Sequence, residues 1–394
     1  MGVHWQTVKL SDAIEINPKE MLPKGTLAKK ISMDMLQPFC RDIPEYEMAE
    51  FFGGTKFKNG DTIMARITPC LENGKTAMVN ILQDDEVGFG STEFIVFRAK
   101  PGVTDPDYVY YLVSSPAVRE PAIKSMVGSS GRQRVQTDVV KGLEISLPSL
   151  SDQQRIAGVL KALDDKIALN TKINNNLEQQ AAAYFYHQFI VNADPSWKEG
   201  AISDLGTVIG GSTPSKSKPE YYTDNGIAWI TPKDLSVDKS KFISHGADDI
   251  TELGLRNSSA SIMPAGTVLF SSRAPIGYIA IADGEVTTNQ GFKSVVPNGN
   301  VGTAFVYYFL KNALPTIENM ASGSTFKEIS GSTMRTVPAV IPDDESLQEF
   351  SDFCEPLFQQ QHTLEAENRS LAALRDSLLP KLMSGELDVS ELDL

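Results

Sequence analysis

The sequence has few of the residues that build covalent or metal-centred sites. Its three cysteines, Cys40, Cys70 and Cys354, are far apart and odd in number. Neither a disulfide framework nor a zinc site is therefore expected. The histidines are scattered as well, at positions 4, 187, 245 and 362. A metal site or a nucleophile-base pair needs a local cluster, so we expect no metal and no catalytic residue of this kind.

Long apolar stretches are also missing. No run approaches the roughly 18 consecutive apolar residues that a membrane helix needs, and the N-terminus lacks the basic and apolar segments of a secretory signal. With 41% hydrophobic residues among 394, the chain can build more than one buried core. We expect two or three domains, a cytoplasmic location and no membrane partner.

Motifs that hold a flipped base or a nucleotide phosphate are not found. The sequence has no Asn/Asp-Pro-Pro-Tyr stretch, and no glycine-rich loop follows a predicted strand. Gly74-Lys75-Thr76 imitates the end of a phosphate-binding loop, but Pro69 stands where that loop needs a glycine. We therefore expect a protein that is not an enzyme and has no cofactor of its own.

The net charge of −14 is unevenly distributed. Residues 1–150 carry −2, residues 151–192 are neutral, residues 193–342 carry −2 and residues 343–394 carry −10. An evenly acidic protein repels nucleic acid, whereas two nearly neutral segments can each present a basic face to phosphate. The composition permits nucleic-acid binding without indicating it.

What the sequence does contain is an internal repeat at an offset near 194. A turn glycine, an apolar strand and an arginine occur in this order at 60–66, and again at 266–273 with one additional residue before the arginine. Five pairs of segments recur in one order: 11–12 and 203–204, 60–66 and 266–273, 109–112 and 306–309, 128–129 and 323–324, and 147–148 and 341–342. Such an order indicates two copies of one fold.

Each copy begins with short alternating apolar stretches that predict strands and ends with a helical pattern. The first helix is expected from Ser151, which has capping-box spacing to Gln154, to about Ile190. The second is expected from near Asp343 to about Leu379-Pro380. A helix of roughly 40 residues is ~60 Å long, more than a globular core requires. We interpret both helices as spacers.

The two helices share one heptad phase, because the apolar positions of one recur 194 residues later in the other. This equal phase predicts that they pack on each other. Asn174 and Asn368 fall at the same a position of the seam, where a buried asparagine lowers stability and fixes register. We expect them to set the helix alignment. The alternative is that they are two solvated amides at a loose point of the seam.

Three local motifs carry a resemblance over essentially the whole chain. They are GGSTPSKSKPEYY at 210–222 with IAWITPKDL at 227–235, LDDKI at 163–167 with Leu177-Glu178, and LLPKLMSGEL at 378–387. With the alternation of globular segments and long helices, they resemble the specificity subunits of Type I restriction-modification systems. That family usually has tryptophan where Tyr222 stands. The first globular segment has Ile16-Asn17-Pro18 in place of the family's Gly-Gly-Thr-Pro opening.

The resemblance implies an α+β fold with a pseudo-two-fold internal repeat. Two β-rich target recognition domains would be separated by two long antiparallel spacer helices that form a coiled coil. The expected parts are residues 1–150 as the first recognition domain, 151–192 as the first spacer helix, 193–342 as the second recognition domain, 343–384 as the second spacer helix, and 385–394 as an acidic C-terminal tail.

The resemblance also implies a function. Each recognition domain would read one half of a bipartite, asymmetric site in double-stranded DNA, and the helices would set the gap between the half-sites. The helices would also dock two modification subunits, which use S-adenosylmethionine to methylate adenine N6. Restriction subunits, with ATP, would add translocation and cleavage. The alternative is a coiled-coil adaptor whose globular ends bind protein.

Readout of base edges needs side chains with paired donors or acceptors, whereas phosphate contacts need positive charge. Loops rich in such residues supply the candidates. In the first domain they are Arg66, Thr68, Ser91, Thr92, Glu93, Arg132, Gln133 and Arg134. In the second domain they are Ser212, Thr213, Lys216, Lys218, Thr231, Lys233, Ser271, Ser272, Arg273, Thr288, Asn289, Gln290, Ser324, Thr325 and Lys327.

Arg66 and Arg273 are the leading candidates, because both end an apolar strand in corresponding places. Arginine suits guanine, and Asn289 and Gln290 suit adenine. For the arginines the alternative is an ion pair within the domain. For serines and threonines it is the capping of turns, and for lysines it is a solvated surface.

Overall fold

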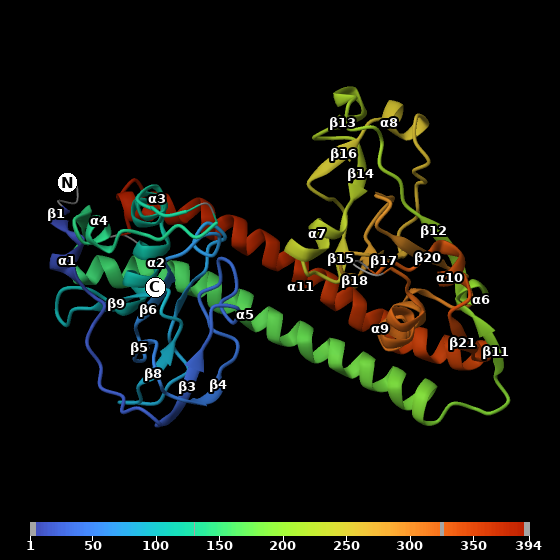
Figure 1. Cartoon of the computed structure of the whole chain (residues 1–394), viewed down its shortest axis with the longest axis horizontal. Helices are drawn as coiled ribbons and strands as arrows, with labels where there is room; N and C mark the ends of the chain where they lie inside the picture. The colour runs from blue at the N-terminus through green and yellow to red at the C-terminus, as the bar shows by residue number, and fades with distance from the viewer. Residues whose placement is uncertain (1–4, 130, 324–326, 390–394) are drawn as a thin grey trace. The chain divides into compact units, whose positions relative to one another are not determined.

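The computed structural model describes residues 5–129, 131–323 and 327–389 (Figure 1). The chain forms two compact units. Unit 1 comprises Met1–Leu169 and Glu367–Leu394, and unit 2 comprises Asn170–Ala366. Both long helices are divided between the units, so the domain limits expected from the sequence remain a prediction.

Unit 1 contains short strands, short helices and the first part of α5. Its elements are β1 (Gln6–Lys9), α1 (Leu10–Ala13), β2 (Ile14–Ile16), β3 (Leu27–Ile31), β4 (Glu47–Glu50), β5 (Thr55–Phe57), β6 (Thr62–Ala65), β7 (Thr76–Met78), β8 (Gly88–Gly90), β9 (Phe94–Ala99), α2 (Pro106–Ser114), α3 (Pro116–Lys124), α4 (Thr137–Lys141), β10 (Glu144–Leu147) and the start of α5 (Leu150–Tyr186).

Unit 2 follows the same order after α5. Its elements are the π-helix η1 (His187–Val191), β11 (Lys198–Ala201), α6 (Ile202–Leu205), β12 (Gly206–Gly210), the 3-10 helix η2 (Pro219–Tyr221), β13 (Tyr222–Thr223), β14 (Ile227–Ile230), α7 (Pro232–Val237), β15 (Phe242–Ile243), β16 (Asp248–Ile250), α8 (Glu252–Arg256), β17 (Val268–Ser272), β18 (Ile276–Ala282), β19 (Thr287–Thr288), β20 (Lys293–Pro297), α9 (Thr303–Met320), α10 (Gly331–Arg335), β21 (Pro338–Ile341) and α11 (Asp344–Ser384).

The main sheets of the two units have equivalent strand orders, β2-β9-β6-β7 in unit 1 and β12-β20-β17-β18-β15 in unit 2. A second sheet in each unit contains one parallel pair, β3 with β8 and β14 with β19. A two-stranded ladder joins the first strand of each copy to its last, β1 to β10 and β11 to β21. The predicted internal repeat is therefore confirmed as a repeat of topology.

Each main sheet packs on the helix that follows it in the chain. The residues of β6 are all buried, and so are those of β17. Against them lie the repeated tyrosine helices, α2 in unit 1 and α9 in unit 2. Asp105 caps α2 by accepting a hydrogen bond from Tyr108 N at 3.0 Å, and Pro106 occupies the first helical position, an arrangement typical of helix starts.

The long helices are close to their predicted limits, with one error. α5 begins at Leu150 and continues through η1 to Val191, as expected. α11 does not stop at Pro380 but continues to Ser384. Leu382 and Met383 are buried in the core of unit 1, and this packing offsets the backbone hydrogen bond that a proline cannot donate.

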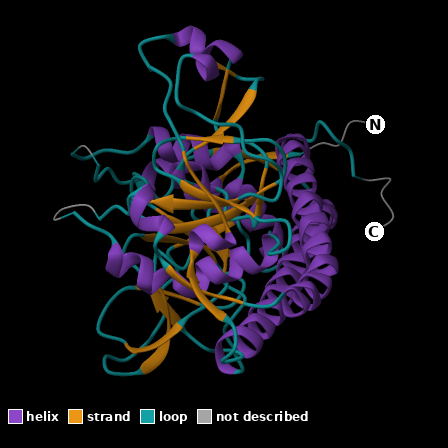
Figure 2. Cartoon of the chain, turned by 90° about the vertical axis from the view of Figure 1, so that its right-hand side faces the viewer, coloured by secondary structure: helices purple, strands orange, loops and turns teal. Residues whose placement is uncertain are grey.

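α5 and α11 lie side by side and antiparallel within each unit (Figures 1 and 2). In unit 2, Tyr184 stacks on Phe353 with ring centroids 4.6 Å apart, and Gln361 Nε2 donates to the carbonyl of Asn174 at 3.1 Å. In unit 1, Arg375 Nη1 lies 2.7 Å from Asp164 and Lys166 Nζ lies 3.5 Å from Glu367. In both units, residue numbers on α11 fall as those on α5 rise.

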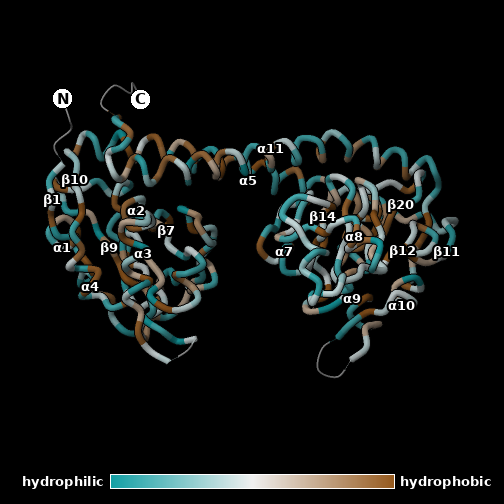
Figure 3. Tube along the Cα trace, turned by 90° about the horizontal axis from the view of Figure 1, so that it is seen from above, coloured by the Kyte–Doolittle hydropathy of each residue, from teal (hydrophilic) through white to brown (hydrophobic). Residues whose placement is uncertain are grey.

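The predicted seam is buried. Among its members, Ile156, Leu160, Leu177 and Ala181 of α5 and Leu347, Phe350, Cys354 and Gln361 of α11 are at most 8% exposed. Ala157, Asp164 and Phe185, each one position beyond the seam, are buried as well. The buried stripe is therefore wider than a two-helix seam, because each helix also packs on the sheets of its unit. Figure 3 shows hydrophobic and hydrophilic residues alternating along both helices.

The two seam asparagines belong to different units. Asn174 is half-buried in unit 2, where its carbonyl accepts the hydrogen bond from Gln361. Asn368 is half-buried in unit 1. Their role in setting the helix alignment remains a prediction, and Gln361 joins them as a polar seam residue that the sequence did not single out.

Candidate nucleic-acid interface

In unit 1, three segments meet where β6 ends, and we call them the tip of unit 1: residues 66–68, 91–93 and 127–135, of which 130 lies outside the described residues. Arg66 N donates to the carbonyl of Glu93 at 2.9 Å, and Val135 N donates to the carbonyl of Arg66 at 2.8 Å. Thr68 and Gln133 are joined by two further bonds of 3.0 Å. The strand end, the turn and the loop are thus fixed to one another by backbone hydrogen bonds.

The tip brings together all the candidates predicted for the first domain. Arg66, Thr68, Ser91 and Gln133 are half-buried, whereas Thr92, Arg132 and Arg134 are exposed. The hydroxyl of Ser91 accepts from Glu93 N at 3.1 Å, so this serine also has the turn-capping role that was the alternative for it. All seven of these side chains are polar or cationic groups of the kinds that read base edges or bind phosphate.

Glu93 is the electrostatic centre of this tip. Arg134 binds it with two nitrogens, at 2.7 and 2.9 Å, and Arg66 Nε lies 4.0 Å away. Hydrogen bonds from Arg134 hold the pKa of Glu93 below its usual range. The alternative predicted for Arg66 was an ion pair within the domain. Arg66 does approach Glu93, but only at 4.0 Å, whereas Arg134 forms the short ion pair with Glu93.

In unit 2, the equivalent segments form the tip of unit 2: residues 272–275, 288–291 and 322–329, of which 324–326 lie outside the described residues. Ser272 N donates to the carbonyl of Gly291 at 2.7 Å, and Ile329 N donates to the carbonyl of Ser272 at 3.1 Å. Arg273 Nη1 lies 3.5 Å from Glu328. This arginine too has an intramolecular carboxylate partner.

These hydrogen bonds correct the predicted equivalence of the two arginines. Arg66 and Ser272 make the same pair of backbone bonds, so they occupy the same position. Arg273 is equivalent to Ile67, since each bridges to the same position of the following loop. The apolar pattern of the strand tolerates a slip of one residue, but consecutive strand positions face opposite sides of a sheet. The two arginines therefore differ in which segment they approach.

Two further candidates of unit 2 are buried in this structure. Ser272 is completely buried and its hydroxyl lies 3.0 Å from the carbonyl of Gly291, to which it donates. Ser271 is completely buried as well, and its hydroxyl donates to the carbonyl of Pro275 at 2.9 Å. The two serines face opposite sides of β17, but every residue of this strand is buried. Neither serine is therefore available at the surface.

The segment after β12 lies beside the turn that contains Asn289 and Gln290. Ser212 N donates to the carbonyl of Thr288 at 2.8 Å, and the hydroxyl of Thr213 donates to Gln290 Oε1. Asn289 Oδ1 accepts from Gly291 N at 2.8 Å. Gln290 is exposed and Asn289 half-buried, whereas Thr288 is buried.

The remaining candidates of unit 2 are spread over other segments. Thr231 donates to Asp234 at 2.7 Å and begins α7, so it has the capping role that was its alternative. Lys216, Lys218 and Lys233 are exposed, and Lys327 Nζ lies 3.4 Å from the carbonyl of Glu318. Ser324 and Thr325 lie outside the described residues.

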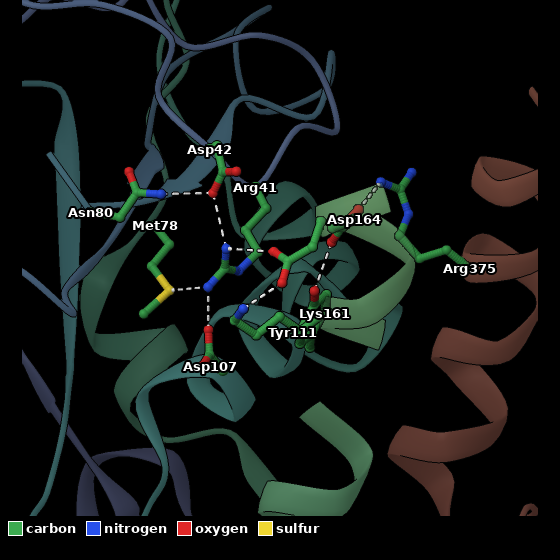
Figure 4. A network of polar contacts seen from close by, with 10 residues as sticks. Arg41, Asp42, Met78, Asn80, Asp107, Tyr111, Lys161, Asp164 and Arg375 are labelled. Atoms are coloured by element: carbon green, nitrogen blue, oxygen red, sulfur yellow. Dashed lines mark hydrogen bonds and ion pairs between the residues drawn. The ribbon is translucent and has the colours of Figure 1, made fainter. Parts of the chain in front are cut away.

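A second polar site in unit 1 joins the globular part to the helices (Figure 4). The hydroxyl of Tyr111 donates to Asp164 Oδ2 at 2.7 Å, and Arg375 Nη1 donates to Asp164 Oδ1, also at 2.7 Å. Asp164 is only 7% exposed. Burial raises the pKa of Tyr111, as does the Asp164 carboxylate beside it, so the phenol is a firm donor at neutral pH.

Unit 2 has a corresponding site around Glu178 of α5. It accepts from the hydroxyl of Tyr308 at 2.8 Å and from Lys311 Nζ at 2.5 Å, and it pairs with Lys241. Lys241 is 6% exposed and also donates to Gln361 at 2.7 Å. Burial alone would raise the pKa of Glu178, but the two ammonium groups hold it below its usual range.

Sequence reasoning missed these two helix-anchoring sites. The visible signals are the repeated Tyr-Tyr pair, at 110–111 and at 307–308, and the motifs at 163–167 and 177–178, which contain Asp164 and Glu178 but do not by themselves indicate an anchoring role. The charged partners could not be found from spacing, because Asp164 and Arg375 are 211 positions apart.

Within residues 5–129, 131–323 and 327–389, no group of three or more His, Cys, Asp or Glu side chains could hold a metal ion. In the same part of the chain, no helix combines the length and the apolarity needed to cross a membrane.

Comparisons with known proteins identify the repeat. A family model described as the Type I restriction modification DNA specificity domain matches residues 2–179 and again residues 195–372. The two matches coincide with the two copies of the topology.

Individual relatives agree with this family. The specificity subunit of the Type I restriction enzyme MjaIX from Methanocaldococcus jannaschii is 40% identical over 178 residues, which is 43% of this chain and 41% of that protein. The HindI specificity subunit from Haemophilus influenzae is 26% identical over 407 residues, covering 84% and 87% of the two chains. The crystal structure of a Type I S subunit from M. genitalium has a TM-score of 0.59 at 17% identity over 97% of this chain and 96% of that one, which supports the fold.

Proposed function

Because the chain belongs to the Type I restriction-modification DNA specificity family, we propose that each of its two tips reads one half of a bipartite, asymmetric site in double-stranded DNA. The observation that carries the proposal is the family match to both copies, each of which has a tip built from equivalent segments. One polypeptide with two different copies of one reading module suits a site with two different halves.

The side chains of the tips support readout of bases as well as contact with phosphate. Exposed arginines and amides supply the paired donors and acceptors that distinguish base edges in the major groove. Arg132 and Arg134 of the first tip and Gln290 of the second are exposed. The carboxylates Glu93 and Glu328 form ion pairs with Arg134 and Arg273. Each arginine would give up this ion pair only for a DNA sequence that offers it a better partner.

The two long helices would act as a spacer and as a docking platform for two modification subunits. Those methyltransferase subunits would bring S-adenosylmethionine and methylate adenine N6, and restriction subunits would bring ATP. The chain itself would catalyse no step and would work in the cytoplasm, where host DNA is found. The antiparallel seam, buried along α5 and α11, supports the role of a stiff spacer.

Methylome sequencing tests this proposal. The chain is co-expressed with its cognate modification subunit in a host that lacks adenine methylation of its own, and the modification subunit alone is the control. We expect methylation at one bipartite sequence, with a gap of one length, only when the chain is present. Methylation that is absent, or the same without the chain, would contradict the proposal and favour the alternative of a coiled-coil adaptor.

A further inference from the structure

The two units differ where the first strand of the main sheet ends. In unit 2, β12 pairs with β20 over five residues, as far as Gly210 opposite Lys293. In unit 1, β2 pairs with β9 over three residues and stops at Ile16 opposite Phe97. The ladder of unit 1 is therefore two residues shorter, and no residue of β2 pairs with Phe94 or Ile95 at the start of β9.

Asn17 and Pro18 end the ladder early. Asn17 has a left-handed backbone with φ of 54°. Its N–H still donates to the carbonyl of Val96 at 2.8 Å, but Val96 N donates to the side-chain Oδ1 of Asn17, at 3.0 Å, and not to a backbone carbonyl. Pro18 has no N–H with which to continue the ladder. The Ile16-Asn17-Pro18 sequence that departs from the family's usual opening therefore has a structural consequence.

A hollow of about 570 Å³ opens beside the first residues of β9. Its lining includes three cationic residues, Lys19, Lys56 and Arg66, together with Phe94 and Val96, whose side chains are buried in the core. Arg66 and Thr92 of the tip line the hollow as well, so it is continuous with the predicted reading surface. The remaining lining residues are Asn17, Pro18, Glu20, Met21 and Thr55.

The hollow is electropositive in spite of its one lining carboxylate. Glu20 forms ion pairs with Arg98 at 2.5 Å and with Lys58 at 3.4 Å, and these two cations neutralise its negative charge. The ion pairs of Glu20 also fix the position of the loop that contains Lys19 and Met21. Met21 is 89% exposed. Lys19 is exposed, and Lys56 is half-buried with its Nζ 5.6 Å from the centre of the Phe51 ring, a contact that leaves the positive charge available to an anion.

Arg66 is available in the same way. Its carboxylate partner Glu93 is 4.0 Å away and is bound more tightly by Arg134. Arg66 can therefore turn toward a ligand without leaving Glu93 unpaired.

In unit 2 the corresponding space is taken by backbone. A Cβ added to Gly211 would lie 1.9 Å from the carbonyl oxygen of Asn289, so the chain after β12 is packed directly on the turn of the tip. The hydroxyl of Thr213 then contacts Gln290, the equivalent of Thr92. The hollow beside Thr92 is thus a property of the path that Asn17 and Pro18 impose on unit 1.

We propose that this hollow binds a sugar-phosphate segment of duplex DNA, with Lys19 and Lys56 on the phosphate and with Arg66 and Thr92 facing the adjacent base edge. The inference rests on the proposed function and names the groups that perform it in unit 1. Cationic lining residues suit the phosphate, and the hollow is continuous with the tip through Arg66 and Thr92, so one duplex can contact both. The binding of an acidic protein segment would not require this continuity.

The test uses the chain in complex with its modification subunits and measures binding to duplexes by fluorescence anisotropy at several salt concentrations. Lys19→Gln with Lys56→Gln is compared with Lys124→Gln with Lys141→Gln, which removes two exposed cations of unit 1 outside the hollow. We expect the first pair to weaken binding roughly 30-fold near 0.15 M salt, and to lower the steepness of the salt dependence by about two, equally on target and non-target DNA. The control pair should change neither quantity.

Each other result is decisive. Equal losses in both pairs would mean general electrostatic attraction and overturn the inference. Loss of co-purifying modification subunits in the first pair, with DNA affinity unchanged, would make the hollow a protein interface and also overturn it. A wild-type complex that binds no DNA would refute the proposed function itself, and this inference with it.

Discussion

At one equivalent backbone position the two tips carry opposite charges. Arg134 and Glu328 both bridge to the end of the neighbouring strand, at Ile67 and at Arg273. In unit 1 the loop supplies the cation and the turn supplies the acid, Glu93. In unit 2 the loop supplies the acid. The tips therefore present different charge patterns on one scaffold, which agrees with the proposed reading of two different half-sites.

The first prediction concerns Arg273. Replacement by Ala should lower the affinity for DNA by ~1 to 3 kcal/mol when the half-site of unit 2 is correct, and should relax discrimination at one base of that half-site. Binding of duplexes with single changes in either half-site measures this. Arg256→Ala removes an exposed cation of the same unit as a control. An equal loss on every sequence would instead identify Arg273 as a phosphate contact.

A second prediction concerns Glu178 and acid. Its pKa in the folded chain is held below the ordinary value of 4.5, so its contribution to stability is present above about pH 4.5 and is lost as pH falls through the lower folded value. We expect Glu178→Gln to lower the melting temperature at pH 7, because Lys241 then stays buried without a carboxylate. Below pH 4.5 the deficit should shrink.

Thermal unfolding from pH 7 to pH 3.5 measures this effect. Glu355→Gln, an exposed position of α11, serves as the control and should follow the wild type. A deficit in the Glu178 variant that stays constant through the acid range would contradict the assigned electrostatic role.

How far individual residues could be predicted depends on the physical signal. The tip segments could be predicted because loops rich in Ser, Thr, Asn and Arg follow recognisable strands. The relation of Arg66 to Arg273 could not, because a one-residue slip leaves the apolar pattern intact and only hydrogen bonds reveal it. Lys19 and Lys56 were missed because the hollow depends on where β2 leaves the sheet.

Among the elements, α5 and α11 could be predicted closely because a heptad pattern is repeated over many turns. The end of α11 was misjudged, since Pro380 reads as a stop in the sequence while the burial of Leu382 and Met383 continues the helix. The contacts of Tyr111 with Asp164, and of Asp164 with Arg375, could not be predicted, because a contact between distant segments produces no periodic pattern in the sequence.

The anchoring of the helices leads to a third prediction. Arg375→Ala should destabilise the chain by roughly 3 to 5 kcal/mol, because it leaves Asp164 buried without its cation. The double variant with Asp164→Asn should recover much of this loss. Urea unfolding measures both. Arg369→Ala, at an exposed position of the same helix, should cost at most about 0.5 kcal/mol; a comparable loss there would mean that helix propensity, not the buried pair, is responsible.

A fourth prediction concerns the polar seam positions. If Asn174 and Asn368 set the alignment of α5 and α11, their joint replacement by Leu should leave the helices folded but alter the recognised gap, since apolar side chains tolerate a shifted pairing. Circular dichroism checks the fold, and methylome sequencing checks the gap. Unchanged specificity in a well-folded double variant would remove the registry role.

At the scale of the whole molecule, the helices are proposed to act as a ruler. Each α-helical residue adds 1.5 Å, so four additional residues in α5, matched by four in α11 to keep the seam in step, add about 6 Å. We expect the insertion to lengthen the preferred gap between half-sites by about two base pairs, given the 3.4 Å rise per pair of duplex DNA. An unaltered gap in a folded, active complex would refute the ruler.

The two helix-anchoring sites divide their charges unequally between the halves of the chain. The two acids, buried Asp164 and half-buried Glu178, come from the first half, while the cations that neutralise them, Arg375, Lys241 and Lys311, come from the second. Two identical first halves would bring together unneutralised acids, and two second halves would bring together unneutralised bases. The two halves of the repeat are thus complementary in charge at these sites, and we expect each to pair with the other half in preference to a copy of itself.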